Sequence, residues 1–390
     1  MVTAQTSAGH LLQLIRNGQA NTRAELQELT GLSRSTVSQR LEMLLGRGWV
    51  RESGADSSTG GRPRTRLEFD RHHAVVLAAV LDTTHAQAAV LDLAGRPLAE
   101  RSGSLLIADG PAPALATITD WFQELLGRIG RSGQEVCGIG LAVPGPVDTS
   151  QGRVVLPPNM PGWDGYPIAD HLQETLEVPV LVDNDANVMA LGEHRAKYPD
   201  SPAFVLAKVS TGIGAGIVID GALYRGIDGG AGDLGHIRMP DLGYALCQCG
   251  SRGCLAAVAS GRALARRLTE LGVPTESGAD FRRHLDAGQP DAARLAREAG
   301  QRVGEVLTTV VCLLNPGLLV IAGDLAETQF VTGVREVLYQ RALPRATRNL
   351  QVTTAELGEP AALYGTALLV VDHLYSIDQS NTRLIAGALP

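Results

Sequence analysis

The most constraining feature of the chain is a cysteine-rich loop at residues 229–255, with the sequence GGAGDLGHIRMPDLGYALCQCGSRGCL. Cys247, Cys249 and Cys254 lie within eight residues as C-x-C-x4-C, and His236 stands eleven residues before the first of them. Thiolates and an imidazole are the ligands that tetrahedral Zn²⁺ prefers, and four of them describe a closed structural site. The loop therefore predicts a structural Zn²⁺ with these four side chains as its ligands.

The cysteines have two other interpretations, a disulfide bridge and a set of unlinked, buried thiols. Gly250 and Gly253 separate the cysteines and are typical of tight backbone turns. Such turns let a loop wrap around an ion, so the zinc interpretation is favoured over both alternatives. The chain has five cysteines in all, an odd number, and together with a thiolate metal site this favours a reducing cytoplasm.

The sequence around this loop resembles the signature of a known protein family. G-D-L-G-H followed by C-x-C-G-x-x-G-C-L is similar to the signature of the ROK proteins, which include sugar kinases and sugar-responsive transcriptional repressors. The resemblance implies an α/β fold of two lobes, the actin-like, sugar-kinase (ribonuclease H-like) arrangement, with a cleft between them. It also implies that His236 both binds the zinc and contacts the sugar.

Length, composition and charge are compatible with a protein of several domains. The chain has 390 residues, of which 44% are hydrophobic and 19% charged, enough for two or three domains. It has no run of eighteen apolar residues and no signal-peptide pattern, so we expect no membrane span. Residues 1–70 carry nine Arg against seven Asp or Glu, whereas the rest carries 25 Lys or Arg against 34 Asp or Glu. This charge distribution is the one expected if only the N-terminal part meets DNA.

The N-terminal part of the chain predicts a winged helix-turn-helix. Apolar residues at helical spacing predict a first helix over residues 10–17. A capping box that begins at Thr22 predicts a second helix, with Leu26 and Leu29 facing inward. Ser33 caps a third helix after a turn that contains glycine. Two short helices joined in this way are typical of the helix-turn-helix, whose second helix enters the major groove.

The predicted DNA contacts lie on the third helix and on a wing that follows it. The polar face of the helix carries Arg34, Ser35, Thr36, Ser38, Gln39 and Arg40. Two short strands are expected at 49–51 and 66–69. The loop between them ends in the tip Gly60, Gly61, Arg62, Pro63 and Arg64. This tip resembles the wing of ROK repressors, and a narrow minor groove attracts such arginines. The alternatives are a flexible linker over residues 54–65 and, for the whole N-terminal part, a module that binds proteins.

The remainder of the chain alternates strands and helices and predicts two α/β lobes. Strands that end in polar residues are expected at 74–82, 136–143 and 178–182, and in a largely parallel sheet such ends line one crevice. The second lobe repeats the pattern, with strands at 204–209, 216–219, 318–321 and about 350–355 and helices at about 260–312, 330–341 and 361–375. We expect domains over residues 1–70, 71–190 and 191–390, with the C-terminal helix returning to the first lobe.

Polar residues of these lobes resemble the sugar site of the ROK family. Residues 182–193 are similar to the family's N-D-A-N…G-E segment, and Asn159 stands before a Gly-Trp pair as it does in the family. The resemblance implies that the sugar contacts are Asn159, Asn184, Asp185, Asp233 and His236. Asn and Asp also cap helices and shape turns, which is the other interpretation. The family commonly has Glu where this chain has Asp233 and Ala256, so either the effector differs from the usual hexoses or the site has decayed.

The parts that hold ATP in the kinases of the family are incomplete in this chain. Where the kinases have D-x-G-G-T, residues 82–85 read Asp-Thr-Thr-His. The late Gly-Gly motif is reduced to Ala322-Gly323-Asp324, whose added carboxylate would repel phosphate. A glycine-rich segment remains at residues 210–216, but such a segment can also simply join two strands. Because phosphate binding needs all these parts together, we expect no ATP binding, no catalytic residues and no enzyme activity.

These observations together predict a cytoplasmic, sugar-responsive transcriptional regulator, a repressor that binds double-stranded operator DNA. We expect a homodimer or homotetramer, because one recognition helix covers too few base pairs. A sugar or sugar derivative that closes the lobes would change the spacing of the paired N-terminal parts, so that DNA and sugar disfavour each other. The alternatives are an active ATP-dependent sugar kinase with a DNA-binding head and a regulator controlled by a protein partner.

Overall fold

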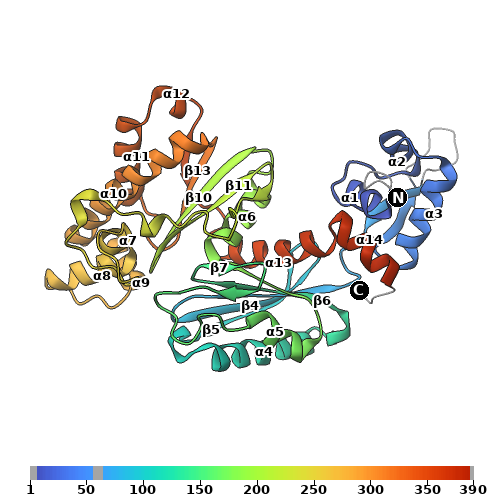
Figure 1. The fold of residues 1–390 in the computed structure, drawn as a ribbon, viewed down its shortest axis with the longest axis horizontal. Coiled ribbons are helices and arrows are strands. Elements are labelled where there is room, and N and C mark those ends of the chain that lie inside the picture. The colour runs from blue at the N-terminus through green and yellow to red at the C-terminus, as the bar shows by residue number, and fades with distance from the viewer. Residues whose placement is uncertain (1–6, 56–64, 387–390) are drawn as a thin grey trace.

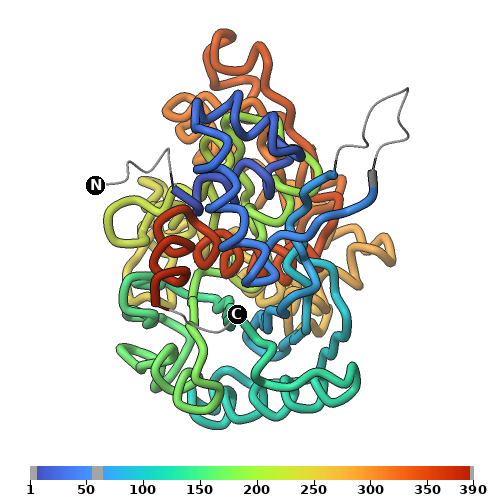
Figure 2. Tube along the Cα trace, turned by 90° about the vertical axis from the view of Figure 1, so that its right-hand side faces the viewer, coloured from blue at the N-terminus to red at the C-terminus, as the bar shows by residue number. Residues whose placement is uncertain are grey.

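The structure is a computed structural model that describes residues 7–55 and 65–386 of the chain. It consists of a small N-terminal head and two α/β lobes, with the head beside the first lobe (Figure 1). Figure 2 shows the same molecule from the side of the head. In the described ranges, no helix has the length and apolar character needed to cross a membrane.

The head has the predicted winged helix-turn-helix elements. They are α1 (Ala8–Arg16), α2 (Arg23–Thr30), α3 (Arg34–Gly46) and an antiparallel pair of strands, β1 (Val50–Ala55) and β2 (Thr65–Phe69). The capping box is present, because the Thr22 hydroxyl accepts from the Glu25 N–H and the Glu25 carboxylate accepts from the Thr22 N–H. Gly31 ends α2 in a left-handed conformation with φ of 67°. The prediction that Leu29 faces inward is wrong: its side chain is 55% exposed, because this short helix buries only Leu26.

The first lobe is built on a five-stranded sheet with the order β5-β4-β3-β6-β9. Its strands are β3 (Val75–Leu81), β4 (His85–Asp92), β5 (Pro97–Ser104), β6 (Val136–Val143) and β9 (Val180–Asn184). The sheet is mixed, since β3 pairs antiparallel with β4 and parallel with β6. Alternate residues of β3 point to opposite faces. Val75 and Leu77 pack on one face with α4 (Pro111–Arg128), and Val76 packs on the other with α13 (Pro360–Leu374).

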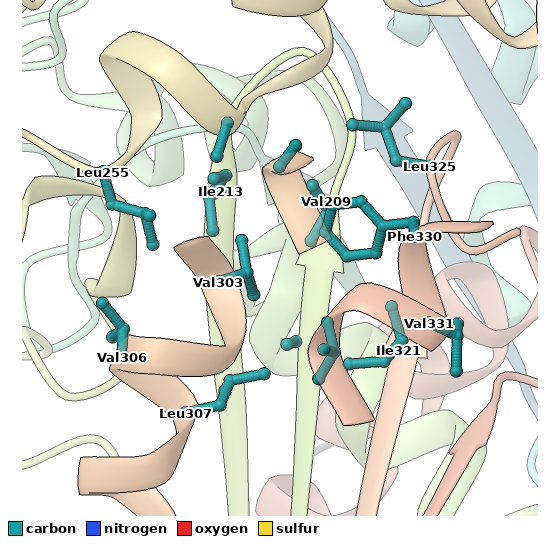
Figure 3. Close-up of a cluster of buried hydrophobic side chains, with 14 of the residues drawn as sticks. Val209, Ile213, Leu255, Val303, Val306, Leu307, Ile321, Leu325, Phe330 and Val331 are labelled. Atoms are coloured by element: carbon teal, nitrogen blue, oxygen red, sulfur yellow. The ribbon is translucent and has the colours of Figure 1, made fainter. Parts of the chain in front are cut away.

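The second lobe repeats this layout around a sheet with the order β12-β11-β10-β13-β14. The strands are β10 (Ala203–Val209), β11 (Ile213–Ile219), β12 (Ala222–Leu223), β13 (Leu318–Ala322) and β14 (Gln351–Thr354). Its helices are α7 (Ala256–Ala259), α8 (Gly261–Glu270), α9 (Gly278–Asp286), α10 (Pro290–Leu314), α11 (Thr328–Arg341) and α12 (Pro344–Thr347). Figure 3 shows the core of this lobe, in which Val303 and Leu307 of α10 meet Phe330 of α11 over the sheet.

Smaller elements connect these layers. In the first lobe they are the 3₁₀ turns η2 (Ile107–Asp109) and η3 (Gly133–Glu135), the short strands β7 (Val147–Asp148) and β8 (Arg153–Val154), and α5 (Ile168–Leu176). In the second lobe they are η4 (Leu234–His236) and η5 (Pro240–Leu242), which belong to the cysteine-rich loop.

Two helices, α6 (Asp185–Lys197) and α13, pack along each other between the lobes. Helix α6 starts directly after β9 and also contacts β10 and β11 of the second sheet. Residue 190, the expected end of the first lobe, lies inside α6, so this helix is shared by both lobes. Helix α13 continues past the first sheet toward the head and is followed by α14 (Ile377–Ala386) (Figure 1).

The head is fastened to these last two helices. The Gly9 N–H donates to the Asn381 side-chain oxygen at 2.9 Å, and Arg16 forms an ion pair with Asp372 of α13. Tyr375 is fully buried, and its ring lies edge-on to that of Trp49 with 5.5 Å between the ring centroids. The head and the first lobe therefore share one hydrophobic core, to which α1, β3 and α13 all contribute.

Candidate functional site

The cysteine-rich loop brings the four predicted metal ligands together. The ligand atoms of His236, Cys247, Cys249 and Cys254 all lie within 4.8 Å of one another. His236 Nδ1 is 3.7 Å from the sulfur of Cys247, and the sulfurs of Cys249 and Cys254 are 3.7 Å apart. All five cysteines of the chain are free thiols, so the disulfide interpretation is wrong. This set of one imidazole and three thiols could hold a metal ion.

The backbone conformation of the loop explains how the four side chains reach one point. The Gly250 N–H donates to the Cys247 carbonyl at 3.0 Å, which closes a tight turn over residues 247–250 that contains the first two cysteines. Gly250 and Gly253 have φ of 82° and 84°, values that glycine adopts without strain. His236 reaches the cluster from the 3₁₀ turn η4.

A cleft of about 220 Å³ lies beside this cluster, between the two lobes. The first lobe contributes residues from three loops and the start of α6, and the second lobe contributes the β10–β11 turn, the cysteine-rich loop and the start of α8. All five predicted sugar contacts line it: Asn159, Asn184, Asp185, Asp233 and His236. His236 therefore belongs both to the metal cluster and to the wall of the cleft.

Asn184 and Asp185 sit where β9 ends and α6 begins. Asn184 is the N-cap of α6: its side-chain oxygen accepts from the Ala186 N–H at 2.9 Å, and its amide donates to the Gly145 carbonyl at 3.0 Å. The capping role is therefore real, and it leaves Asn184 one N–H and one oxygen lone pair toward the cleft. The Asp185 carboxylate accepts a charge-assisted hydrogen bond from Lys208.

The ion pair with Lys208 sets the charge at this end of the cleft. Burial opposes the charge of the ammonium, but the Asp185 and Asp82 carboxylates outweigh it and raise the pKa of Lys208. Burial, followed by the charge of Asp82, raises the pKa of Asp324. Three carboxylates therefore gather around one cation, an arrangement that disfavours a further anion.

The two remaining predicted contacts, Asn159 and Asp233, also line the cleft. Asp233 is exposed and begins the turn η4 without capping it. Asn159 is half-buried, and its side-chain oxygen accepts a hydrogen bond from Arg262 at 3.2 Å. Since Asn159 comes from the first lobe and Arg262 from α8 of the second, this hydrogen bond spans the cleft.

The segments expected to hold phosphates in a kinase have structural roles here. The glycine-rich segment joins β10 to β11, which pair antiparallel from Val209 and Ile213 outward. The Ser210 hydroxyl accepts from the Asp324 N–H at 3.1 Å, so this turn packs against Asp324. Thr83 lines the cleft, and His85 is exposed.

The predicted DNA-binding face is solvent-accessible on α3. Arg34, Ser35 and Gln39 are exposed, whereas Thr36, Ser38 and Arg40 are half-buried. The Ser33 hydroxyl caps the helix and lies 2.9 Å and 2.8 Å from the hydroxyls of Ser35 and Thr36. The predicted wing tip, Gly60, Gly61, Arg62, Pro63 and Arg64, lies outside the described residues.

Two of the cations that line the cleft, Lys208 and Arg262, were not predicted from the sequence. Each stands near a glycine motif: Lys208 lies two residues before Ser210-Thr211-Gly212, and Arg262 directly follows Ser260-Gly261. A basic residue beside such a motif is the only signal that could have pointed to them. Their partners, Asp185 and Asn159, are far away in the sequence, so the pairing depends on how the lobes meet.

Family models match both parts of the chain. A model of the ROK family matches residues 81–373, and a model of the IclR helix-turn-helix domain matches residues 8–54. The first covers the two lobes and the second covers the three helices of the head with most of β1.

Known proteins resemble the chain to different extents. The xylose repressor of Bacillus spizizenii is 29% identical over 374 residues, which cover 94% of this chain and 95% of that protein. The glucokinase of Halalkalibacterium halodurans is 31% identical over 291 residues, 70% of this chain and 88% of that protein. The crystal structure of a ROK family transcriptional regulator, a homolog of the E. coli MLC protein, has a TM-score of 0.82. It shares 24% identity and covers 99% of this chain and 100% of its own, which shows a common fold.

Proposed function

The chain belongs to the ROK family, and on this premise we propose that it is a transcriptional repressor that binds operator DNA and is controlled by a sugar or sugar derivative. One observation supports this proposal above the others. The chain combines a helix-turn-helix head with a kinase-like cleft in which the phosphate-binding motifs are incomplete. The match to a xylose repressor extends over head and lobes alike, whereas the match to a glucokinase covers 70% of the chain. We assign the head to residues 1–70 and the lobes to residues 71–190 and 191–390.

The effector site is the cleft between the lobes. Its proposed contacts are Asn159, Asn184, Asp185, Asp233 and His236. Carboxylate and carboxamide groups that converge on a small cleft are suited to the paired hydroxyls of a sugar. Asp185 accepts a sugar hydroxyl with the lone pairs that Lys208 and the Ala186 N–H leave open.

The metal of the cysteine-rich loop is a structural Zn²⁺ held by His236 and the three cysteines. Four ligands about 2.3 Å from a tetrahedral Zn²⁺ stand about 3.8 Å apart, and two of the contacts in the cluster measure 3.7 Å. No carboxylate and no open position belongs to the ligand set, as is usual for structural zinc. The ion would fix the ring of His236 at the wall of the cleft. Thiolate ligands also support a cytoplasmic protein, because the cytoplasm keeps them reduced.

The DNA site is the outer face of α3 together with the wing tip. The contacts that we propose are Arg34, Ser35, Thr36, Ser38, Gln39 and Arg40 on α3, with residues 60–64 as the wing. The exposed Arg34 and Gln39 can reach base edges, and Ser35 leaves room for a close approach of α3 to the groove. We propose a symmetric homo-oligomer, a dimer or tetramer, because a pair of heads is needed to cover two half-sites.

The effector acts on the head through α6 and α13. Asn184 and Asp185 stand at the first turn of α6, α6 packs along α13, and α13 carries the residues that hold the head. A ligand that draws the lobes together on α6 therefore changes the position of α13 and of the head. DNA and effector disfavour each other by the same coupling free energy, because linkage is reciprocal.

Fluorescence anisotropy with an operator duplex, selected from random DNA on the immobilised protein, tests the proposal. We expect tight, salt-sensitive binding that weakens when a bound sugar saturates the cleft. Arg34→Ala should weaken DNA binding without changing sugar affinity, and Arg294→Ala, which removes an exposed charge of the second lobe, should change neither. Equal DNA affinity with and without saturating sugar would disprove the coupling, and ATP-dependent phosphorylation of a sugar would favour the kinase alternative.

A further inference from the structure

The buried carboxylate of Asp183 joins the two lobes directly before the proposed sugar contacts. Asp183 belongs to β9 of the first sheet, where it pairs with Ala142 of β6, and its side chain is only 1% exposed. Arg225, which follows β12 of the second sheet, donates from Nε to Asp183 Oδ2 at 2.8 Å, and its Nη2 lies 2.7 Å from the same oxygen. This ion pair therefore connects the end of a first-lobe strand to a loop of the second lobe.

The other oxygen of this carboxylate is also engaged. Asp183 Oδ1 accepts from the Asn187 side-chain amide at 2.9 Å and from the Asn184 N–H at 2.7 Å. Asn187 lies in the first turn of α6, and α6 presses against the second sheet: a Cβ added to Gly216 of β11 would lie 2.5 Å from the Ala186 carbonyl oxygen. The carboxylate is thus held on one side by the second lobe and on the other by a helix that packs on that lobe.

The loop that begins at Arg225 continues into the wall of the cleft. Residues 229–233, which include a proposed sugar contact, line the cleft. Gly229 packs closely on the first lobe, because a Cβ at this position would lie 2.3 Å from the Val147 carbonyl oxygen. On the first-lobe side, Asp183 directly precedes two further proposed contacts. Short stretches of backbone therefore connect the ion pair to sugar contacts on both walls.

From this arrangement we propose that Asp183 and Arg225 are positioning residues, whose ion pair fixes how the two lobes meet at the cleft. A buried ion pair adds little net stability, because the loss of water around two charges offsets their attraction, but it can hold the parts that it joins in one arrangement. A sugar that needs both walls binds more tightly when the walls are already in place. The inference rests on the proposed sugar site and adds two residues that do not line it.

Calorimetric titration of the full-length protein with D-xylose and with D-glucose tests the inference. We expect Arg225→Gln to weaken the binding of whichever sugar the wild-type protein binds by about tenfold or more, as for other charge pairs that join two surfaces. Arg225→Lys keeps the charge but loses the second donor, so its affinity should be intermediate. Arg297→Gln is the matched control, because it breaks an ion pair with Glu336 inside the second lobe; it should bind sugar as the wild-type protein does.

A double variant separates positioning from stability. Removal of one partner leaves a buried charge unpaired and lowers the melting temperature, whereas removal of both charges restores much of the loss. Asp183→Asn combined with Arg225→Met should therefore melt close to the wild-type protein and still bind sugar about tenfold more weakly. Recovery of both the melting temperature and the sugar affinity would mean that the ion pair only stabilises the fold, and would overturn the inference.

Hydrogen exchange of the unliganded proteins gives a second measurement, which does not depend on a sugar. In the double variant we expect amides of residues 183–187 and 226–233 to exchange about tenfold faster, while those of β3 and β13 keep their wild-type rates. Unchanged exchange at the junction, or an equal increase in both sheets, would contradict the positioning role. If neither sugar binds the wild-type protein, the proposed sugar site is wrong, and the exchange rates decide whether the ion pair holds the lobes.

Discussion

Gly192 on α6 and Gly365 on α13 face each other at the point where these two helices cross. A Cβ added to Gly365 would lie 1.8 Å from the Val188 carbonyl oxygen and 2.9 Å from the backbone nitrogen of Gly192. Each helix therefore presses its bare backbone against the other, and neither can slide without moving its neighbour. This crossing lies between the cleft and the head. We therefore expect a conformational change in the cleft to reach the head through it.

We predict that Gly365→Ala lowers the melting temperature by several degrees and weakens the effect of ligand on DNA affinity. Overpacking of a close contact costs about 1–3 kcal/mol, and here the atoms that would be struck are backbone atoms, which cannot rotate away. Calorimetry and anisotropy measure the two effects. Gly127→Ala in α4 is the control. Apart from the neighbouring backbone of α4, no atom of the described residues lies within 4 Å of its new methyl group, so it should leave both quantities unchanged or raise stability slightly.

Asp372 links the head to α6. Its carboxylate pairs with Arg16 of the head and accepts from Arg195 of α6 at 3.0 Å. The carboxylate is about one-third exposed, so we predict that Asp372→Asn changes stability by less than about 1 kcal/mol. The ligand-induced change in DNA affinity should shrink, because the head loses its ion pair with α13, the helix that packs along α6. Asp291→Asn, which breaks an exposed pair with Arg294 in the second lobe, should leave this change intact; an unchanged response in Asp372→Asn would refute the link.

Removal of one metal ligand tests the zinc centre. We predict that Cys249→Ser reduces the bound zinc, measured by atomic emission after dialysis, from about one ion per chain to near zero. The melting temperature and the sugar affinity should fall with it, because the metal no longer fixes His236. Cys312→Ser, which alters an exposed thiol outside the cluster, should keep the full zinc content. Full zinc content in Cys249→Ser would contradict the assigned ligand set.

Acid should destabilise the protein through its buried histidines. Burial lowers the pKa of the half-buried His73 and of the buried His194 in the folded protein. The unfolded chain then binds protons more readily, so the free energy of unfolding should fall as the pH drops below about 6.5, the usual pKa of an unfolded histidine. Melting temperatures between pH 8 and pH 5.5 measure this loss.

His73 provides the variant for the acid experiment. Its ring contacts the Asp70 carbonyl and lies 2.7 Å from the Tyr375 hydroxyl, at the junction of head and first lobe. His73→Gln removes the titrating group and should make the loss of stability in acid smaller. His85→Gln, at an exposed position, should follow the wild-type curve. An equal acid response in His73→Gln would mean that other groups cause the loss.

The metal cluster and the framework of the lobes could be predicted because their signals are local. His236 and the last cysteine are close in sequence, and the strands carry their own apolar patterns. The contact between Arg262 and Asn159 could not be predicted in this way. The two residues are far apart in the sequence, and their hydrogen bond forms only where the two lobes meet. The head shows the same limit: the periodic pattern predicts that Leu29 is buried, whereas its side chain is 55% exposed in the structure.

The fastening of the head by α13 and α14 has a consequence for synthesis. Gly9 meets Asn381, its partner 372 residues later, and His73 meets Tyr375, 302 residues later. During translation of the lobes, Trp49 and Phe69 cannot yet pack against the ring of Tyr375. The head therefore lacks its contacts with α13 and α14 until the end of synthesis. A premature stop codon before α13 would produce a chain that has the head but lacks the helices that connect the head to the cleft. Such a product could compete for operator DNA but could not answer the effector, so nonsense mutations late in the gene should give a dominant, uninducible phenotype.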